Sequence, residues 1–141
     1  DARSDAEWRP DASNYLEWIG LLKCATAFEA YCKVHTAAID PMSVAEFLLL
    51  DAQFPHSIRF VVDTLQSSLD AIGRLSPGHR VNRVQRIAGR LQAELSFTQI
   101  DEVMDRGIAN TMQHIREGCY TIHNCVHESF VSYPIESALE V

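Results

Sequence analysis

Two histidines and a cysteine have the residue types and spacing of a metal site. Cys119, His123 and His127 follow one another at intervals of four residues, so in a helix their side chains would lie on successive turns, as helical metal ligands do. The same helical projection puts Cys119 on an apolar stripe and both histidines on the polar side. A zinc site also needs a fourth ligand or an open coordination position, which nothing in the sequence marks. We therefore expect surface histidines beside a core cysteine, with no bound metal and no other cofactor.

Two kinds of enzyme remain as alternatives to a non-catalytic domain. One would use a metal at the Cys119/His123/His127 cluster, and the other a carboxylate at Glu29. When residues 14–37 are projected as one helix, Glu29 falls within an apolar stripe, and burying a lone carboxylate is costly. A buried ion pair, or a position at the rim of the bundle end, is therefore the favoured interpretation of Glu29 over a catalytic acid. Because the chain also lacks a nucleophile elbow and a phosphate-binding glycine loop, we assign no catalytic residue.

Arginines are concentrated in one segment. No acidic residue lies between Asp70 and Glu94, and the arginines of that stretch are Arg74, Arg80, Arg83, Arg86 and Arg90. On a helix, Arg83, Arg86 and Arg90 fall within about 60° of one another, which predicts an exposed basic patch. The favoured interpretation is a solvated face paired with acids from neighbouring helices. The alternative is a site for an anion or an acidic partner.

Composition limits the class of protein. The 141 residues suit one domain, 47% of them are apolar, and the net charge of −7 argues against a nucleic-acid partner. No apolar run approaches the roughly 18 residues of a membrane span, so we expect no membrane partner. The cysteines at positions 24, 32, 119 and 125 are best interpreted as reduced residues of a cytoplasmic protein.

Apolar periodicity predicts an all-α fold, an antiparallel bundle of about five helices, four long and one short. The predicted long helices cover about 14–37, 56–73, 79–96 and 98–130. The short helix begins at a Ser43 capping box and ends before Pro55. The second long helix carries a one-sided stripe that we expect in the core: Ile58, Val61, Val62, Leu65, Leu69 and Ile72. Residues 1–12 form a polar lead-in, and residues 13–141 a single domain.

Two apolar features do not fit a self-sufficient bundle. The short helix is apolar nearly all round, with Phe47 followed by Leu48–Leu50, and Phe60 projects from the side opposite its own helix's stripe. The short helix is either wedged centrally in the bundle or meets another chain or a missing segment, and both interpretations stay open. Phe60 and the basic patch of Arg83, Arg86 and Arg90 are our candidate partner-binding residues.

Several segments resemble the bacterial alpha-E family over roughly residues 15–133. They are Trp18 with Leu21-Leu22, FEAY at Phe28–Tyr31, VAEFLLLDAQFPHS at Val44–Ser57, and Arg86-x-x-Gly89-Arg90-Leu91-x-Ala93-x-Leu95. The most specific is FLLLDxxFPxS, in which His56 stands where family members usually carry arginine. The resemblance is to the C-terminal half of the family, because the naming motif, a Tyr-Trp followed by Glu-Arg-Ala, belongs to the N-terminal half and is absent here. It implies a fragment of a longer family member.

The resemblance implies a context rather than a reaction. The alpha-E family is a predicted all-helical group of unknown biochemical function, typically encoded with or fused to ATP-grasp peptide ligases and transglutaminase-like proteases. It implies a non-catalytic accessory or interaction domain in a peptide synthesis or tagging system. The protein partners that we expect are the missing N-terminal half, a second copy of the chain, or the peptide ligase.

Overall fold

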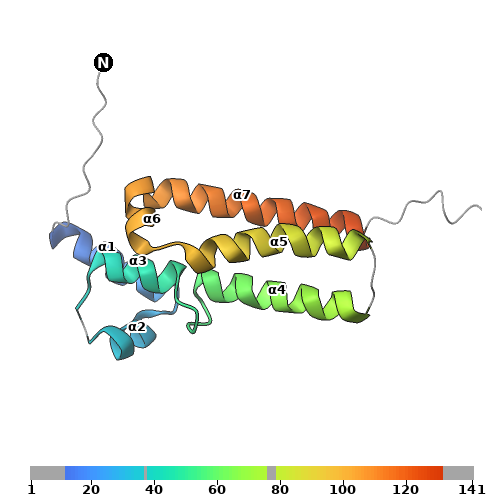
Figure 1. The fold of residues 1–141 in the computed structure, drawn as a ribbon. Coiled ribbons are helices and arrows are strands. Elements are labelled where there is room, and N and C mark those ends of the chain that lie inside the picture. Colours follow the sequence, from blue (N-terminus) through green and yellow to red (C-terminus); the bar gives the residue numbers. More distant parts are fainter. Residues whose placement is uncertain (1–11, 37, 76–78, 132–141) are drawn as a thin grey trace, which may run out of the picture.

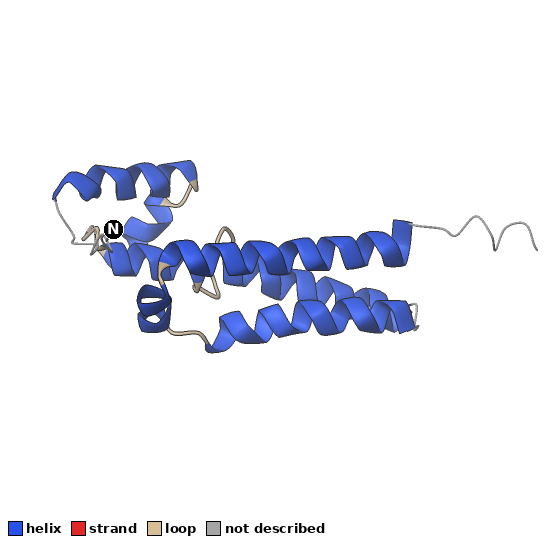
Figure 2. Cartoon of the chain, turned by 90° about the horizontal axis from the view of Figure 1, so that it is seen from above, coloured by secondary structure: helices blue, strands red, loops and turns tan. Residues whose placement is uncertain are grey.

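All regular elements in the described part of the chain are helices. The computed structural model describes residues 12–36, 38–75 and 79–131 (Figures 1 and 2). The elements are α1 (Ala12–Cys24), α2 (Phe28–His35), α3 (Pro41–Leu49), α4 (Ile58–Leu75), α5 (His79–Phe97), α6 (Ile100–Arg106), α7 (Ile108–Val126) and a π-helical turn (His127–Val131). The all-α prediction is confirmed. The expected lead-in lies outside the described residues up to position 11, and Ala12 already belongs to α1.

Three long helices form the body of the molecule. α5 packs against both α4 and α7, whereas α4 and α7 do not pack directly against each other in the described residues. α4 and α7 run in one direction and α5 runs back between them, while α1, α2, α3 and α6 gather at one end (Figure 1). The three long helices therefore occupy three corners of an antiparallel four-helix arrangement.

Two of the predicted long helices are each divided in two. Thr26 has a φ of 51° and separates α1 from α2, and Gly107 has a φ of 88° and separates α6 from α7. A residue with positive φ cannot continue a right-handed helix. The described residues therefore form seven α-helices where the periodicity predicted about five.

α3 lies at the centre of the molecule. It packs against α1, α2, α4 and α6, and its side chains contribute to two apolar cores. Phe47 belongs to the first core with Leu22 and Tyr31, and Leu49 belongs to the second core with the inner faces of α4, α5 and α7. The structure therefore supports the first of the two interpretations, in which this short helix is wedged centrally in the bundle.

The start of α3 differs from the predicted capping box. Asp40 caps the helix, because its Oδ2 accepts hydrogen bonds from the Ser43 backbone N–H and from Ser43 Oγ, both at 3.0 Å. Pro41 occupies the first turn, where its missing N–H costs nothing. Ser43 is therefore a partner of the cap and not the cap itself.

Candidate functional site

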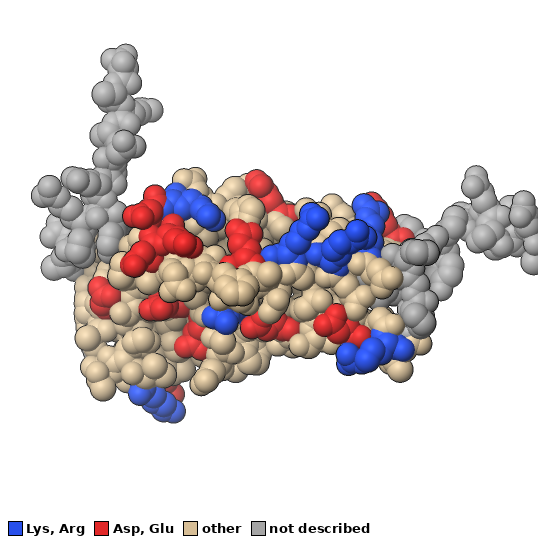
Figure 3. Space-filling model, in the orientation of Figure 1, with Lys and Arg blue, Asp and Glu red and all other residues tan. Residues whose placement is uncertain are grey.

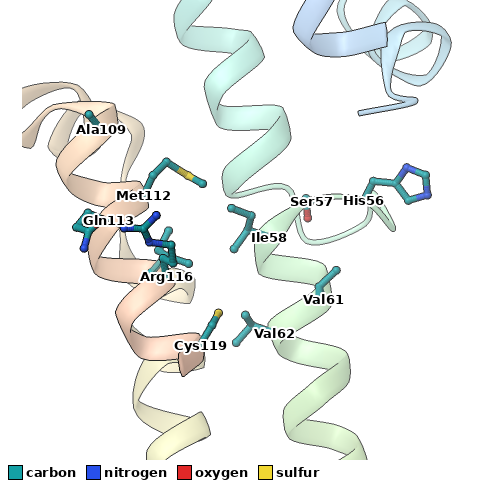
Figure 4. Close-up of a pocket in the computed structure, with 11 residues that line it drawn as sticks. His56, Ser57, Ile58, Val61, Val62, Ala109, Met112, Gln113, Arg116 and Cys119 are labelled. Atoms are coloured by element: carbon teal, nitrogen blue, oxygen red, sulfur yellow. Dashed lines mark hydrogen bonds between the residues drawn. The ribbon is translucent and has the colours of Figure 1, made fainter. Parts of the chain in front are cut away.

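An apolar groove lies between α4 and α7 (Figure 4). It has a volume of about 600 Å³, and Ile58 and Val62 of α4 point across it toward Met112 and Cys119 of α7. We call it the α4–α7 groove. Its full lining is His56, Ser57, Ile58, Val61, Val62, Ala109, Met112, Gln113, Ile115, Arg116 and Cys119.

The groove continues at both ends into smaller hollows. A hollow of about 310 Å³ shares His56, Ile58 and Met112 with the groove and extends it toward Trp18 and Leu21 of α1. A third hollow shares Arg116 and Cys119 and extends the groove along α7; its other lining residues are Tyr120 and His123. Because each smaller hollow shares lining residues with the groove, we call the three hollows together the trough.

Two apolar side chains of the α4 stripe that the periodicity assigned to the core are exposed, Val61 in the lining of the groove and Ile72 outside the three hollows. Val61 is 53% exposed and Ile72 is 41% exposed, so their prediction as core residues was wrong, although Val62 and Leu69 are buried. The physical reason is the three-cornered arrangement. The apolar stripe of α4 is wide enough to face both α5 and the fourth corner, and no described helix fills that corner.

The trough has a positive character. Arg116 carries the only formal charge among the residues lining the three hollows, which also include His56 and His123 but no carboxylate. Arg116 donates a hydrogen bond from its guanidinium to Gln113 Oε1 at 2.5 Å. In the described part of the chain Arg116 has no carboxylate partner.

The most specific segment of the family resemblance builds the corner between α3 and α4. Asp51 Oδ1 accepts hydrogen bonds from the backbone N–H groups of Gln53 at 2.7 Å and Phe54 at 2.8 Å. The fully buried Ser57 donates from Oγ to the Asp51 carbonyl and accepts from the Phe60 N–H at 3.0 Å. The carboxylate closes the turn and the serine caps α4, so these residues position the wall of the groove.

His56 joins this corner to the end of α1. Its Nδ1 lies 3.0 Å from the Ala25 carbonyl oxygen and 2.7 Å from Thr26 Oγ1. Because Thr26 Oγ1 itself donates to the Ala25 carbonyl at 2.7 Å, the consistent assignment is a protonated Nδ1 that donates to both oxygens. An arginine here could donate to the same carbonyl, which gives a physical reason why histidine can stand in its place.

Replacing His56 by alanine is expected to lower the free energy of unfolding by about 1 kcal/mol, because the Ala25 carbonyl loses one of its two side-chain donors and the Thr26 hydroxyl loses the His56 donor. Denaturant unfolding followed by circular dichroism measures the change. His123→Ala, at another exposed histidine, is the matched control and should change stability by less than about 0.5 kcal/mol. Equal effects of the two substitutions would contradict this role of His56.

The Cys119/His123/His127 cluster is only partly assembled. Cys119 and His123 line the third hollow without His127. In the described ranges no group of three histidine, cysteine, aspartate or glutamate residues could hold a metal ion. The prediction of Cys119 as the core cysteine was wrong. The buried face of α7 is instead Thr111, Ile115, Ile122 and Cys125, and Cys119 lies beside it, exposed in the lining of the groove.

Of the two structural interpretations of Glu29, the buried ion pair was wrong. Glu29 is exposed in the first turn of α2. The positive φ at Thr26 ends the helical phase that had placed it among apolar residues. An acidic side chain in a first helical turn interacts favourably with the helix dipole, which accounts for Glu29 without a catalytic role.

The basic patch lies on α5, away from its buried face. Arg83, Arg86 and Arg90 are all exposed, and basic side chains gather over this helix in Figure 3. Arg83 forms a 3.4 Å ion pair with Glu128, whereas Arg86 and Arg90 have no carboxylate partner within the described ranges.

Phe60 is half-buried near the start of α4. Since α4 and α5 are antiparallel, Phe60 and Arg83 lie at opposite ends of the pair (Figure 1), and the structure does not bring them together.

Tyr31, from the FEAY segment of the resemblance, is a core residue. Its ring is fully buried, and its hydroxyl donates to the Ala38 carbonyl at 2.9 Å. Burial raises the pKa of Tyr31 above its ordinary value of 10.0. The hydroxyl is therefore neutral near neutral pH and acts as a structural donor.

The fold and the groove define an all-helical domain with one open corner. The sequence matches the model of the Alpha-E family, described as a predicted alpha-helical domain with a conserved ER motif, over residues 1–131. The chain therefore belongs to the Alpha-E family. No glutamate in the chain is followed by arginine, and correspondence to the C-terminal half of the family stays a prediction.

Comparison of the sequence with curated proteins and with solved structures returned no match. None of the helices in the described ranges is long and apolar enough to cross a membrane.

Proposed function

We propose that this chain is a non-catalytic interaction domain that holds a partner polypeptide in the α4–α7 groove. The observation that carries the proposal is the exposed apolar lining contributed by two helices that do not pack against each other. Val61 is 53% exposed and Met112 is 39% exposed, although both belong to apolar faces. Covering such a surface removes apolar area from water and so favours association.

The partner that we propose is an ATP-grasp peptide ligase of a cytoplasmic peptide synthesis or tagging system. Membership in the Alpha-E family supports this choice through the context that the resemblance implies. The free state of all four cysteines suits a reducing compartment. Arg86 and Arg90, exposed and without carboxylate partners in the described structure, offer a second contact for an acidic surface of the ligase.

Size-exclusion chromatography of the purified chain with an ATP-grasp peptide ligase from the same genome tests the proposal. We expect the two proteins to elute together at concentrations of about 10–50 μM, a range in which a complex with a micromolar dissociation constant is detected. Separate elution of the two proteins over this range would contradict the proposed accessory role.

A further inference from the structure

We infer that the occupant of the α4–α7 groove is an amphipathic helix of the partner that runs antiparallel to α4 and α7 and presents a carboxylate to Arg116. This inference rests on the proposed function and specifies the chemistry of the partner at that site.

The direction follows from the three long helices. α4 and α7 are parallel and α5 is antiparallel to both (Figure 1). In an up-down four-helix arrangement each helix is antiparallel to its two neighbours. A helix at the fourth corner would neighbour α4 and α7, so it must run in the same direction as α5.

The size follows from the walls. α4 has 18 residues and α7 has 19 residues, so a helix that covers them has about 18–20 residues and a length of about 27–30 Å. Its inner face must be apolar, because Ile58, Val62 and Met112 point into the space between the walls (Figure 4).

The charge follows from Arg116. This guanidinium lines both the groove and the third hollow, and no carboxylate lines either one. Gln113 Oε1 satisfies one of its five N–H donors. A glutamate on the incoming helix would add charge-assisted hydrogen bonds to the remaining donors.

The same charge argues against a second copy of this chain. In a two-fold symmetric dimer a surface patch meets itself. Two troughs joined in this way would bring together two arginines and several histidines, with no carboxylate from either lining. A different polypeptide with an acidic residue on its apolar face fits the trough better.

Three stapled helical peptides of about 20 residues test the inference. They share one apolar face and carry glutamate, glutamine or lysine at the central position that faces the groove. Binding to the ¹⁵N-labelled full chain is measured by NMR titration. We expect the glutamate peptide to bind about fivefold more tightly than the glutamine peptide, with the lysine peptide weakest. The shifted amide signals should lie in α4 and α7.

The charge preference should depend on Arg116. In Arg116→Gln, an exposed position, the glutamate and glutamine peptides should bind equally. Val61→Asp should abolish binding of all three peptides. Val34→Asp, the same change at a valine that is 62% exposed on α2, should leave binding unchanged. Circular dichroism of each variant confirms that the helices remain folded.

The direction has its own readout. A nitroxide on the N-terminus of the glutamate peptide should broaden amide signals near His123, toward the end of α7, and should spare those near Ala109 at its beginning. The opposite pattern would overturn the antiparallel orientation.

Two results would contradict the proposal that an acidic amphipathic helix occupies the groove. One is equal or tighter binding of the lysine peptide. The other is failure of all three peptides to bind while the chain still elutes with the ligase, which would leave the accessory role standing and reject the acidic helix in the groove. Loss of ligase binding with retained peptide binding would instead reject the proposed partner and support the groove chemistry.

Discussion

Replacing Phe47 by alanine is expected to lower the free energy of unfolding by about 3–5 kcal/mol. Phe47 is only 3% exposed and stacks on Phe54 with ring centroids 4.5 Å apart. It also meets the edge of Tyr31 at 5.6 Å. Truncation to alanine removes this apolar surface from the core and leaves a cavity where α1, α2 and α3 meet.

The large loss of stability expected for Phe47→Ala depends on the burial of its ring, so a phenylalanine on the surface is the matched control. Phe97 is 82% exposed at the end of α5, and Phe97→Ala should change stability by less than about 0.5 kcal/mol. Urea unfolding monitored by circular dichroism compares the two variants. A loss below about 1 kcal/mol for Phe47→Ala would contradict the central position of α3.

Replacing Ser57 by alanine is expected to lower the free energy of unfolding by about 2–3 kcal/mol. The substitution removes the cap of α4, because the Phe60 N–H loses its acceptor. It also removes the hydroxyl that donates to the Asp51 carbonyl, at a position with no solvent exposure. Water therefore cannot replace the lost partners without entering the core.

A second serine on α4 provides the control for this prediction. Ser68 is exposed and donates only to the Thr64 carbonyl one turn earlier, so Ser68→Ala should be nearly neutral. If both serine variants unfold at the same urea concentration, Ser57 does not hold the corner between α3 and α4.

Sequence periodicity predicted most of the helical structure, and its failures have local causes. The predicted helices at 56–73 and 79–96 differ from α4 and α5 by two residues or fewer at each end. The division at Thr26 was missed because threonine rarely adopts a positive φ and no glycine marks the position. Gly107 is a possible break in the sequence, but a single glycine is often tolerated within a helix. Only the structure shows that Gly107 ends α6.

The groove was harder to predict than the helices. Periodicity identifies an apolar stripe but does not tell which part of it meets a neighbour, so Val61 was assigned to the core with Val62. Arg116 was missed as a site residue. A sequence pattern could have identified it. Met112, Arg116 and Cys119 follow one another at helical spacing and form a second row on α7, beside the buried row of Ile115 and Ile122.

Several residues of the resemblance motifs have structural roles. Asp51 and Ser57 close the corner before α4, Tyr31 fills the first core, and Leu91 approaches Gly118, where an added Cβ would lie 3.3 Å from its Cδ2. Gly118 thus lets α5 and α7 pack closely. These residues fix the walls of the groove rather than supply reactive groups.

The affinity of Val61→Asp for the ATP-grasp peptide ligase tests the docking role of the α4–α7 groove most directly. Isothermal titration calorimetry compares this variant with the unmodified chain and with Val34→Asp, which places the same carboxylate on an exposed valine outside the trough. A carboxylate buried without a partner against the apolar wall should weaken binding about 100-fold, while Val34→Asp should bind like the unmodified chain. Equal affinities of all three proteins would contradict the groove as the docking surface.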